Sequence, residues 1–232
     1  MPTKKTSRTE VMKRIKALTN PANRAAMARF GIRATKAYGL TAPQIKRLAR
    51  EIGKDHRLAQ RLWATGIHDA RHLAAMIDDP RAVTEAQIER WLREFDSWDI
   101  VDGCCRYLFL FTPFAWKKAA EWSCCKKEYE KRAAFSLMAY LAIHDKRAPD
   151  AEFARLLPLI KRAATDERNF VKKAVDWALR QIGKRNLALN RLAIKTAEDV
   201  RAIGSPAARW IAADALRELT SSAVQRRLRA RA

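Results

Sequence analysis

Long apolar runs are missing from this sequence. No stretch of its 232 residues approaches the roughly 20 consecutive apolar residues that span a bilayer. Residues 1–14 are basic and polar, without the apolar core of a secretory signal peptide. A P-loop, a glycine-rich dinucleotide turn and a Ser-His-Asp arrangement are also missing. We therefore expect a cytoplasmic protein that uses no cofactor and is not embedded in a membrane.

Cysteine and histidine are scarce, and neither shows the spacing of a metal site. The four cysteines form two adjacent pairs, Cys104-Cys105 and Cys124-Cys125. Because C-x-x-C spacing is lacking, we interpret them as small buried thiols, with a disulfide between two helices as the alternative. His68 and His72 share one face of a predicted helix, but no carboxylate or cysteine completes a ligand set with them. The sequence therefore predicts no metal.

Alternation of period 2 with hairpin turns is also absent, so a β-sheet has no obvious source. Helical spacing of apolar residues fills almost every segment between short breaks such as Gly204-Ser205-Pro206. Capping boxes that begin at Thr41 and Thr84 indicate two helix starts. The apolar run 107–111 could form a buried strand, but its helical surroundings favour a central helix.

The predicted helices are short and joined by short loops, which is typical of antiparallel helix pairs. A globular bundle and an α-solenoid both fit, and pairs at roughly 35–45 residue intervals favour HEAT-like stacking. We expect a basic segment with a first helix over 1–20, one continuous domain over 21–219 and a basic tail over 220–232. The arginine-rich tail is either a disordered phosphate-binding arm or a frayed, solvated end.

Positive charge is what the sequence has in excess. It contains 47 Lys and Arg residues against 25 Asp and Glu residues, a formal net charge of +22. Small domains typically carry a net charge of magnitude about 2–8, so this excess indicates a polyanionic partner. Nucleic acid is the leading candidate, and an anionic membrane surface or the ribosome are the alternatives.

The stretch 95–102, Phe-Asp-Ser-Trp-Asp-Ile-Val-Asp, is unusual in so basic a chain. In a helix, Trp98 and Asp102 would project from the same face. An aromatic ring beside a carboxylate can hold a cation, or stabilise a centre that becomes cationic. Asp102 could instead pair with Arg106, one turn later. We interpret Asp96 and Asp99 as surface or capping residues.

Several short motifs follow one another in order along most of the chain. They are Gly31-Ile32, Lys36-Ala37-Tyr38-Gly39, Pro43, Leu62-Trp63, Asp69-Ala70-Arg71, the stretch 95–102, Lys131-Arg132-Ala133, and Asn169-Phe170-Val171-Lys172-Lys173-Ala174 with Trp177. In this order, over roughly 21–219, the sequence resembles the DNA alkylation repair family of AlkD-type DNA glycosylases. The resemblance implies an all-α, HEAT-like solenoid, a curved α-α superhelix with a concave basic groove for DNA.

The resemblance also implies an activity. Such an enzyme would release cationic N3- and N7-alkylated purines from double-stranded DNA by hydrolysing the N-glycosidic bond, as the first step of base excision repair. It would act as a monomer in the bacterial cytoplasm, at the nucleoid. Because the pattern marks no Schiff-base lysine, we expect a monofunctional glycosylase without strand cleavage.

Individual roles follow from the same resemblance. It implies that Asp102 is the catalytic aspartate, that Trp98 and Trp177 line the lesion site, and that Arg132 lies near the DNA backbone. Lys172 and Lys173, about one turn before Trp177, are either further DNA contacts or part of a solvated face. Trp63, Trp91, Trp116, Trp122 and Trp210 are predicted to pack in the core or between helices.

The chemistry suits these residue types. An alkylated purine is already cationic, so its bond to C1′ is weak, and positive charge builds on the deoxyribose as the bond breaks. A fixed carboxylate such as Asp102 can stabilise that charge and orient a water molecule. Each indole face contributes about 0.5–2 kcal/mol toward a nearby cation. The alternatives are a non-catalytic DNA- or RNA-binding protein that recognises shape or damage, and a helical scaffold for acidic proteins.

Overall fold

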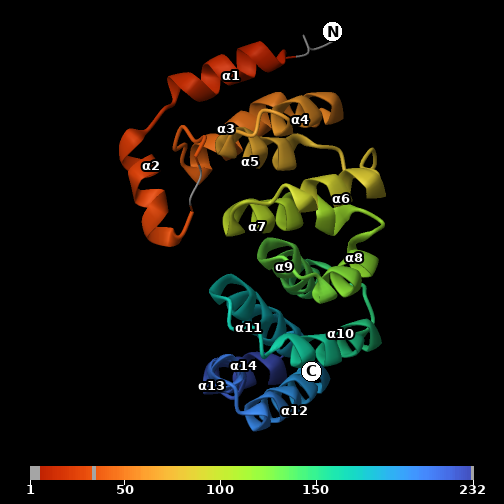
Figure 1. Ribbon diagram of the computed structural model, residues 1–232. Helices are drawn as coiled ribbons and strands as arrows, with labels where there is room; N and C mark the ends of the chain where they lie inside the picture. Colours follow the sequence, from red (N-terminus) through yellow and green to blue (C-terminus); the bar gives the residue numbers. More distant parts are fainter. Residues whose placement is uncertain (1–5, 33–34, 231–232) are drawn as a thin grey trace. The chain divides into compact units, whose positions relative to one another are not determined.

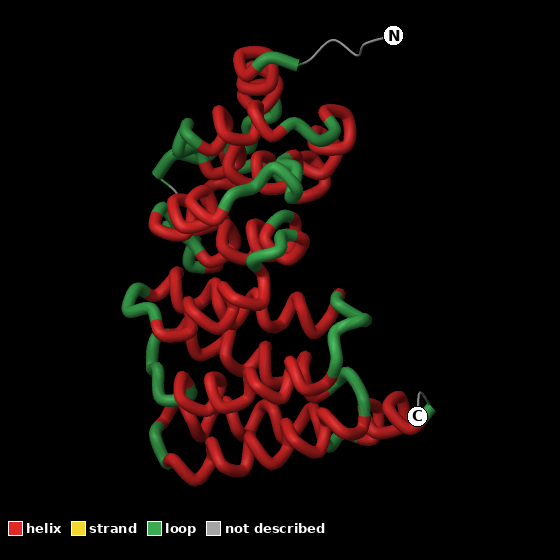
Figure 2. Tube along the Cα trace, turned by 90° about the vertical axis from the view of Figure 1, so that its right-hand side faces the viewer, coloured by secondary structure: helices red, strands yellow, loops and turns green. Residues whose placement is uncertain are grey.

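The computed structural model describes residues 6–32 and 35–230, and within these ranges every regular element is a helix (Figures 1 and 2). The all-α prediction is therefore confirmed. No helix in the described part is both long enough and apolar enough to cross a membrane. The chain divides into two compact units, Met1–Thr112 and Pro113–Ala232. The single continuous domain predicted over 21–219 stays a prediction, and residues 1–5 of the predicted N-terminal segment lie outside the described ranges.

Unit 1 is built from short helices. In chain order they are α1 (Arg8–Ala17), α2 (Pro21–Met27), the 3-10 helix η1 (Ala28–Phe30), α3 (Ala42–Ile52), α4 (His56–Trp63), α5 (His68–Ile77), α6 (Glu85–Arg93), α7 (Trp98–Tyr107) and the 3-10 helix η2 (Phe109–Phe111). Helix α5 is central, because α3, α4 and α7 all pack against it (Figure 1). The apolar run 107–111 is neither a strand nor a continuous α-helix, since α7 ends at Tyr107 and one 3-10 turn follows.

The core of unit 1 contains a tryptophan stack. The rings of Trp63 and Trp91 lie parallel, 3.9 Å apart, and both residues are buried as predicted. Glu94 accepts a hydrogen bond of 2.7 Å from Trp63 Nε1, and the Arg71 guanidinium lies 4.9 Å from the centre of the Trp63 ring. The polar edge of a core tryptophan is therefore satisfied without opening the interior to water.

The two predicted capping boxes have different outcomes. At Thr41 the box forms, and Gln44 Oε1 accepts the Thr41 backbone N–H at 2.8 Å. At Thr84 the hydroxyl does accept the Gln87 N–H, but the Gln87 side chain turns away and donates to Asp78 at 2.7 Å. Asp78 is completely buried, and burial raises the pKa of its carboxyl. Leaving the buried carboxylate of Asp78 without a donor would cost more free energy than leaving the Thr84 backbone N–H, at the start of α6, without the glutamine acceptor.

Unit 2 contains longer helices. They are α8 (Ala115–Glu121), the 3-10 helix η3 (Trp122–Cys124), α9 (Glu128–His144), α10 (Asp150–Ala163), α11 (Asn169–Gly183), α12 (Leu187–Ile203), α13 (Pro206–Leu219) and α14 (Ser222–Arg229). Helix α11 packs against α9, α12 and α13. Gly183 makes one of these contacts possible, because a Cβ there would lie 2.8 Å from the Cβ of Ala193. Trp122 is buried, and Trp116 packs edge-on against Phe153 between α8 and α10.

The basic tail is a helix and not a disordered arm. Ser221 caps α14 by accepting the N–H of Val224, and the buried side chains of Val224 and Leu228 anchor it. Gln225 donates to Asn190 and to the Leu219 carbonyl at 3.0 and 2.7 Å. Neither sequence alternative, a disordered arm or a frayed end, describes residues 222–229; residues 231 and 232 lie outside the described ranges.

Two further predictions about burial are wrong. Trp210 is 40% exposed on α13, where Lys172 Nζ lies 5.2 Å above its ring, so it is not a core residue. Cys104 and Cys105 are buried as predicted, but Cys124 is exposed. Cys124 ends a short 3-10 turn at the surface, so a thiol there gains nothing from core packing.

Candidate functional site

Helix α7 positions the predicted catalytic pair. Ser97 is its N-cap residue, Trp98 its first residue, and Asp102 follows one turn later on the same face. Both side chains are partly exposed. Trp98 Nε1 donates a hydrogen bond of 2.8 Å to the backbone oxygen of Phe30, which fixes one edge of the indole. Phe30 itself is 67% exposed, so the residue whose carbonyl holds Trp98 carries an aromatic side chain at the surface.

The segment that carries Phe30 is fastened to α5 through residues 38–40. Asp69, which is buried, accepts the backbone N–H groups of Tyr38 and Leu40 at 2.6 and 2.7 Å. Gly39 adopts φ +80°, and a Cβ at this position would lie 2.5 Å from a backbone oxygen at the start of α2. Only glycine permits this close approach. The start of α2 is thereby tied to the helix against which α7 packs.

Beneath Trp98, the next residue of α7 turns toward α5. Asp99 Oδ2 lies 2.9 Å from His68 Nε2 and 3.1 Å from His72 Nε2. The statement that no carboxylate joins His68 and His72 is therefore wrong, and so is the assignment of Asp99 to the surface. Asp96 keeps its surface position, with a side chain 58% exposed. The sequence does not reveal the cluster because Asp99 is about thirty residues away from the two histidines.

The electrostatics of this cluster are strongly coupled. Burial alone would raise the pKa of Asp99, but the two neighbouring imidazoles of His68 and His72 outweigh it and hold that pKa far below its usual range. Burial also disfavours a charged His68, yet Asp99 outweighs this effect and raises the His68 pKa. Asp99 is therefore a fixed negative charge, one residue after Trp98 and three before Asp102.

Unit 2 holds the second predicted aromatic, Trp177, on α11. Its ring meets the Tyr140 ring of α9 edge-on at 4.9 Å. With its amide turned to accept, the Gln181 side-chain oxygen receives hydrogen bonds from Trp177 Nε1 and Lys184 Nζ, both 3.0 Å. Trp177 is thus a partly exposed, oriented ring, as a binding surface requires. Its meeting with Trp98 and Asp102 in one site stays a prediction.

The predicted DNA-contacting residues of unit 2 differ in exposure. Lys173 is exposed, and Lys172 is partly exposed against Trp210. Arg132 is only 6% exposed and donates to the Phe170 carbonyl at 2.7 Å, which holds the start of α11 against α9. Its contact with the DNA backbone stays a prediction.

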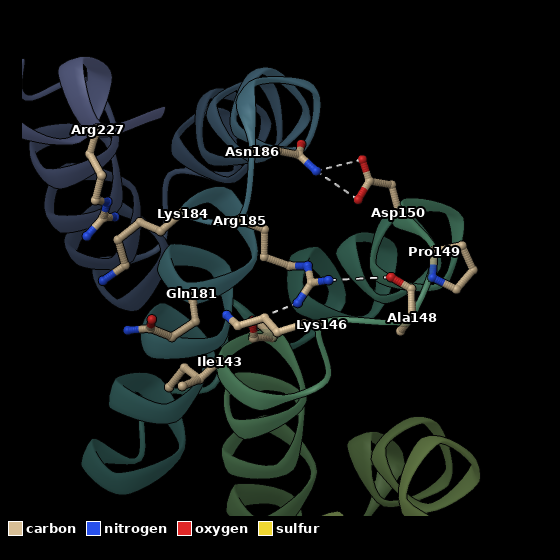
Figure 3. A pocket seen from close by; sticks show the side chains of 11 residues that line it. Ile143, Lys146, Ala148, Pro149, Asp150, Gln181, Lys184, Arg185, Asn186 and Arg227 are labelled. Carbon is tan, nitrogen blue, oxygen red and sulfur yellow. Dashed lines mark hydrogen bonds between the residues drawn. The ribbon is translucent and has the colours of Figure 1, made fainter. Parts of the chain in front are cut away.

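A basic cavity of about 590 Å³ in unit 2 was not expected from the sequence (Figure 3). Its basic lining residues are Lys146, Lys184, Arg185 and Arg227, and Gln181 and Asp150 also line it. Arg185 is held in place by the carbonyls of Ala142 and Asp145, at 2.8 and 2.9 Å. Cationic side chains around a hollow suit an anion such as a phosphate group. In the sequence, only the consecutive residues Lys184 and Arg185 indicate this concentration of positive charge. Arg227 belongs to the segment 220–232, which was predicted to be a tail.

The described part of the chain is all-α, with paired helices, a large positive charge and a partly exposed Trp–Asp pair, which are the features of a helical-repeat protein suited to a polyanionic partner. A family model described as "DNA alkylation repair enzyme" matches residues 11–219. The chain therefore belongs to the DNA alkylation repair enzyme family, as the sequence motifs predicted. No curated protein matches it.

A solved structure is also similar. It is described as "a new family of proteins related to the HEAT-like repeat DNA glycosylases with affinity for branched DNA structures". It shares 21% sequence identity with this chain at a TM-score of 0.75, and the match covers 84% of this chain and 83% of that one. The HEAT-like helical-repeat fold is therefore confirmed, whereas the concave basic groove stays a prediction.

Proposed function

We propose that the protein is a DNA glycosylase that removes cationic N3- and N7-alkylated purines from duplex DNA. The observation that carries the proposal is the pair of Trp98 and Asp102 on one face of α7, in a chain of net charge +22 from a family described as DNA alkylation repair enzymes. We assign Asp102 the role of stabilising positive charge, and the lesion supplies that charge.

The reaction needs no cofactor. When the N-glycosidic bond breaks, its electron pair moves to the cationic base, which leaves neutral, and the sugar becomes oxocarbenium-like. Asp102 stabilises this cation, a water molecule attacks C1′, and the proton that the water loses passes to solvent. Trp98 presents the π face of an indole whose N–H is held by the Phe30 carbonyl, so the ring cannot turn away from the same charge.

DNA binding comes mainly from phosphate contacts. In unit 2, exposed Lys173, partly exposed Lys172 and the residues around the basic cavity provide cations. Each phosphate that such a cation neutralises steepens the salt dependence of binding by about 0.9 in log–log slope. We assign Trp177 and Arg132 the roles that the resemblance implies, at the lesion and at the backbone. These contacts place the protein on DNA without reading the sequence of bases.

A base-release assay tests the proposal. Wild-type protein should release 7-methylguanine from methylated duplex DNA, and Asp102→Asn should lower the rate about 100-fold, the typical cost of removing one group that stabilises transition-state charge. Affinity for duplex should not fall, because an anionic carboxylate is not a phosphate-binding group. The matched control is Asp96→Asn, which removes an exposed carboxylate from the same segment and should retain activity. Equal rates for Asp102→Asn and wild type would refute the role of Asp102.

A second candidate function is recognition of branched DNA without catalysis. The similarity to a structure described as having affinity for branched DNA favours it. Competition between a four-way junction and a linear duplex of the same sequence distinguishes the two functions. Preference for the junction, together with no base release by wild-type protein, would establish the second function and eliminate the first. Binding of neither DNA at low salt would point to a scaffold for acidic proteins.

A further inference from the structure

The cluster of His68, His72 and Asp99 between α5 and α7 is unexplained by glycosylase chemistry. The two histidines lie one turn apart on α5, so their rings leave the same face. Their ring centres are 4.8 Å apart and the rings are steeply inclined to each other, at 73°. One ligand-type atom from each histidine and from Asp99 lie within 4.8 Å of one another. Three potential ligand atoms are thus gathered in one small volume.

Hydrogen bonds alone do not account for the cluster, because His68 is left without one at its buried Nε2. The residue is 7% exposed, and its Nε2 is buried without a hydrogen-bond partner. Asp99 Oδ2 is only 2.9 Å away, but it lies outside the direction in which that ring nitrogen can donate. A buried polar atom of this kind requires an explanation, and a bound ion is one of the few available.

The surroundings hold all three side chains in place. Gly103 leaves room for the His72 ring, because a Cβ at Gly103 would lie 2.9 Å from His72 Nδ1. The second oxygen of Asp99 accepts a hydrogen bond from Ser97 Oγ at 2.5 Å, which fixes the orientation of the carboxylate. Outer hydrogen bonds of this kind are usual around metal-binding carboxylates. His72 and Asp99 retain side-chain exposures of 15% and 16%, so an ion can enter and keep a water ligand.

We propose that His68 Nε2, His72 Nε2 and one oxygen of Asp99 form a binding site for a first-row divalent transition-metal ion, such as Zn²⁺, that fastens α7 to α5. Two imidazoles and one carboxylate are a donor set that suits these ions. Bond lengths of about 2.0–2.1 Å in a tetrahedral site place neighbouring ligand atoms about 3.3 Å apart. The distances of 2.9 and 3.1 Å from Asp99 Oδ2 to the two Nε2 atoms need to lengthen by only a few tenths of an ångström. The ligand atoms of the two histidines, which lie within 4.8 Å of each other, are brought to the same spacing by rotation of the imidazole rings.

The ion would be structural. The site lies at the start of α7, one residue after Trp98 and three before Asp102, so it would fix the helix that carries both side chains. Glycosidic hydrolysis as proposed above involves no metal, and the site does not depend on that proposal. A metal-binding protein without glycosylase activity would therefore still confirm the site.

The experiment uses the full chain, stripped with a chelator and titrated with ZnCl₂ by calorimetry. We expect one Zn²⁺ per wild-type chain, and affinity at least tenfold weaker in both His68→Gln and His72→Gln, since each loses one of three protein ligands. The matched control is His56→Gln. His56 also pairs with a buried carboxylate, Asp78 at 2.7 Å, but has no second histidine, so this variant should bind like wild type.

Two outcomes would overturn the site. One is wild-type protein that takes up no Zn²⁺; the other is uptake that both histidine variants retain and that Cys124→Ser abolishes. Co²⁺ as a spectroscopic probe guards against misfolded variants. Wild-type protein should show d–d bands without a thiolate charge-transfer band, whereas a strong thiolate band would assign the ion to the cysteines. Zn²⁺ should also raise the melting temperature of wild type and of His56→Gln, but not that of His72→Gln.

Discussion

We predict that Asp176, the residue before Trp177, makes the stability of unit 2 dependent on pH. It is 1% exposed, and its Oδ2 accepts Arg180 Nε at 2.9 Å. Its other oxygen is buried without a hydrogen-bond partner. Burial raises the pKa of Asp176 to about 7; Arg180 opposes the rise, and the charge of Asp214 adds to it. The perturbation that tests this is Asp176→Asn, which removes the titration and keeps an acceptor for Arg180.

The magnitude follows from the two pKa values of this carboxyl. The folded state holds the proton up to about pH 7, whereas the unfolded chain releases it near 3.8. Because the folded state binds the proton more tightly, this carboxyl makes the protein less stable as the pH rises from about 4 to about 7 and has a constant effect above that. A difference of about 3 pH units, at 1.36 kcal/mol each, corresponds to about 4 kcal/mol.

The assay is urea denaturation at pH 4 to 8, followed by the fluorescence of the tryptophans of unit 2. The free energy of unfolding of Asp176→Asn, minus that of wild type, should increase by about 4 kcal/mol between pH 4 and pH 8. The constant cost of burying an amide cancels in this comparison. Asp199→Asn, which removes a half-exposed carboxylate paired with Lys161, should follow wild type. Parallel pH profiles for wild type and Asp176→Asn would show that Asp176 stays ionised, and would refute the reasoning.

Two further substitutions test how α5 is held in unit 1. Gly103→Ala should gain helix propensity, but its Cβ would push against the His72 ring, so the free energy of unfolding measured with urea should fall by about 1–3 kcal/mol. In a His72→Ala background the same change should be neutral or stabilising. An equal loss of stability in that background would contradict the contact. Asp69→Asn turns an amide N–H₂ toward one of two backbone donors, so it should lower the free energy of unfolding by about 1–3 kcal/mol. Hydrogen exchange of the backbone N–H groups of Tyr38 and Leu40 should accelerate. Unchanged exchange at both residues would show that Asp69 does not hold residues 38–40.

Most of the fold could be predicted because it depends on local patterns. Apolar side chains at helical spacing become the buried faces of helices whatever their partner is, so the helical class follows from the sequence. The tail also carries a local helix signal. Ser221 followed by Val224 and Leu228 has the cap and the apolar spacing of a helix, which the density of arginines obscured. The second capping box failed because Gln87 bonds to Asp78 instead of the helix start.

The candidate site could be predicted only where its residues are neighbours in sequence. Trp98 and Asp102 share a helix face by spacing alone. The exposed positions of Phe30 and Trp210 depend on which helix covers which, and no local pattern contains that information. The basic cavity of unit 2 could not be predicted for the same reason, because Lys146 and Arg227 are distant in sequence and line one cavity only after folding.

The cluster of His68, His72 and Asp99 depends both on spacing along one helix and on packing between two helices. Consecutive residues of an α-helix are rotated by about 100°, so α7 carries two neighbouring rows of side chains, Trp98 with Asp102 and Asp99 with Gly103. The sequence shows both rows but not which one faces inward. His68 and His72 on α5 decide it, because they receive the carboxylate of Asp99 and fill the space above Gly103. With the second row fixed inward, the first is turned toward the surface, where Trp98 and Asp102 are partly exposed.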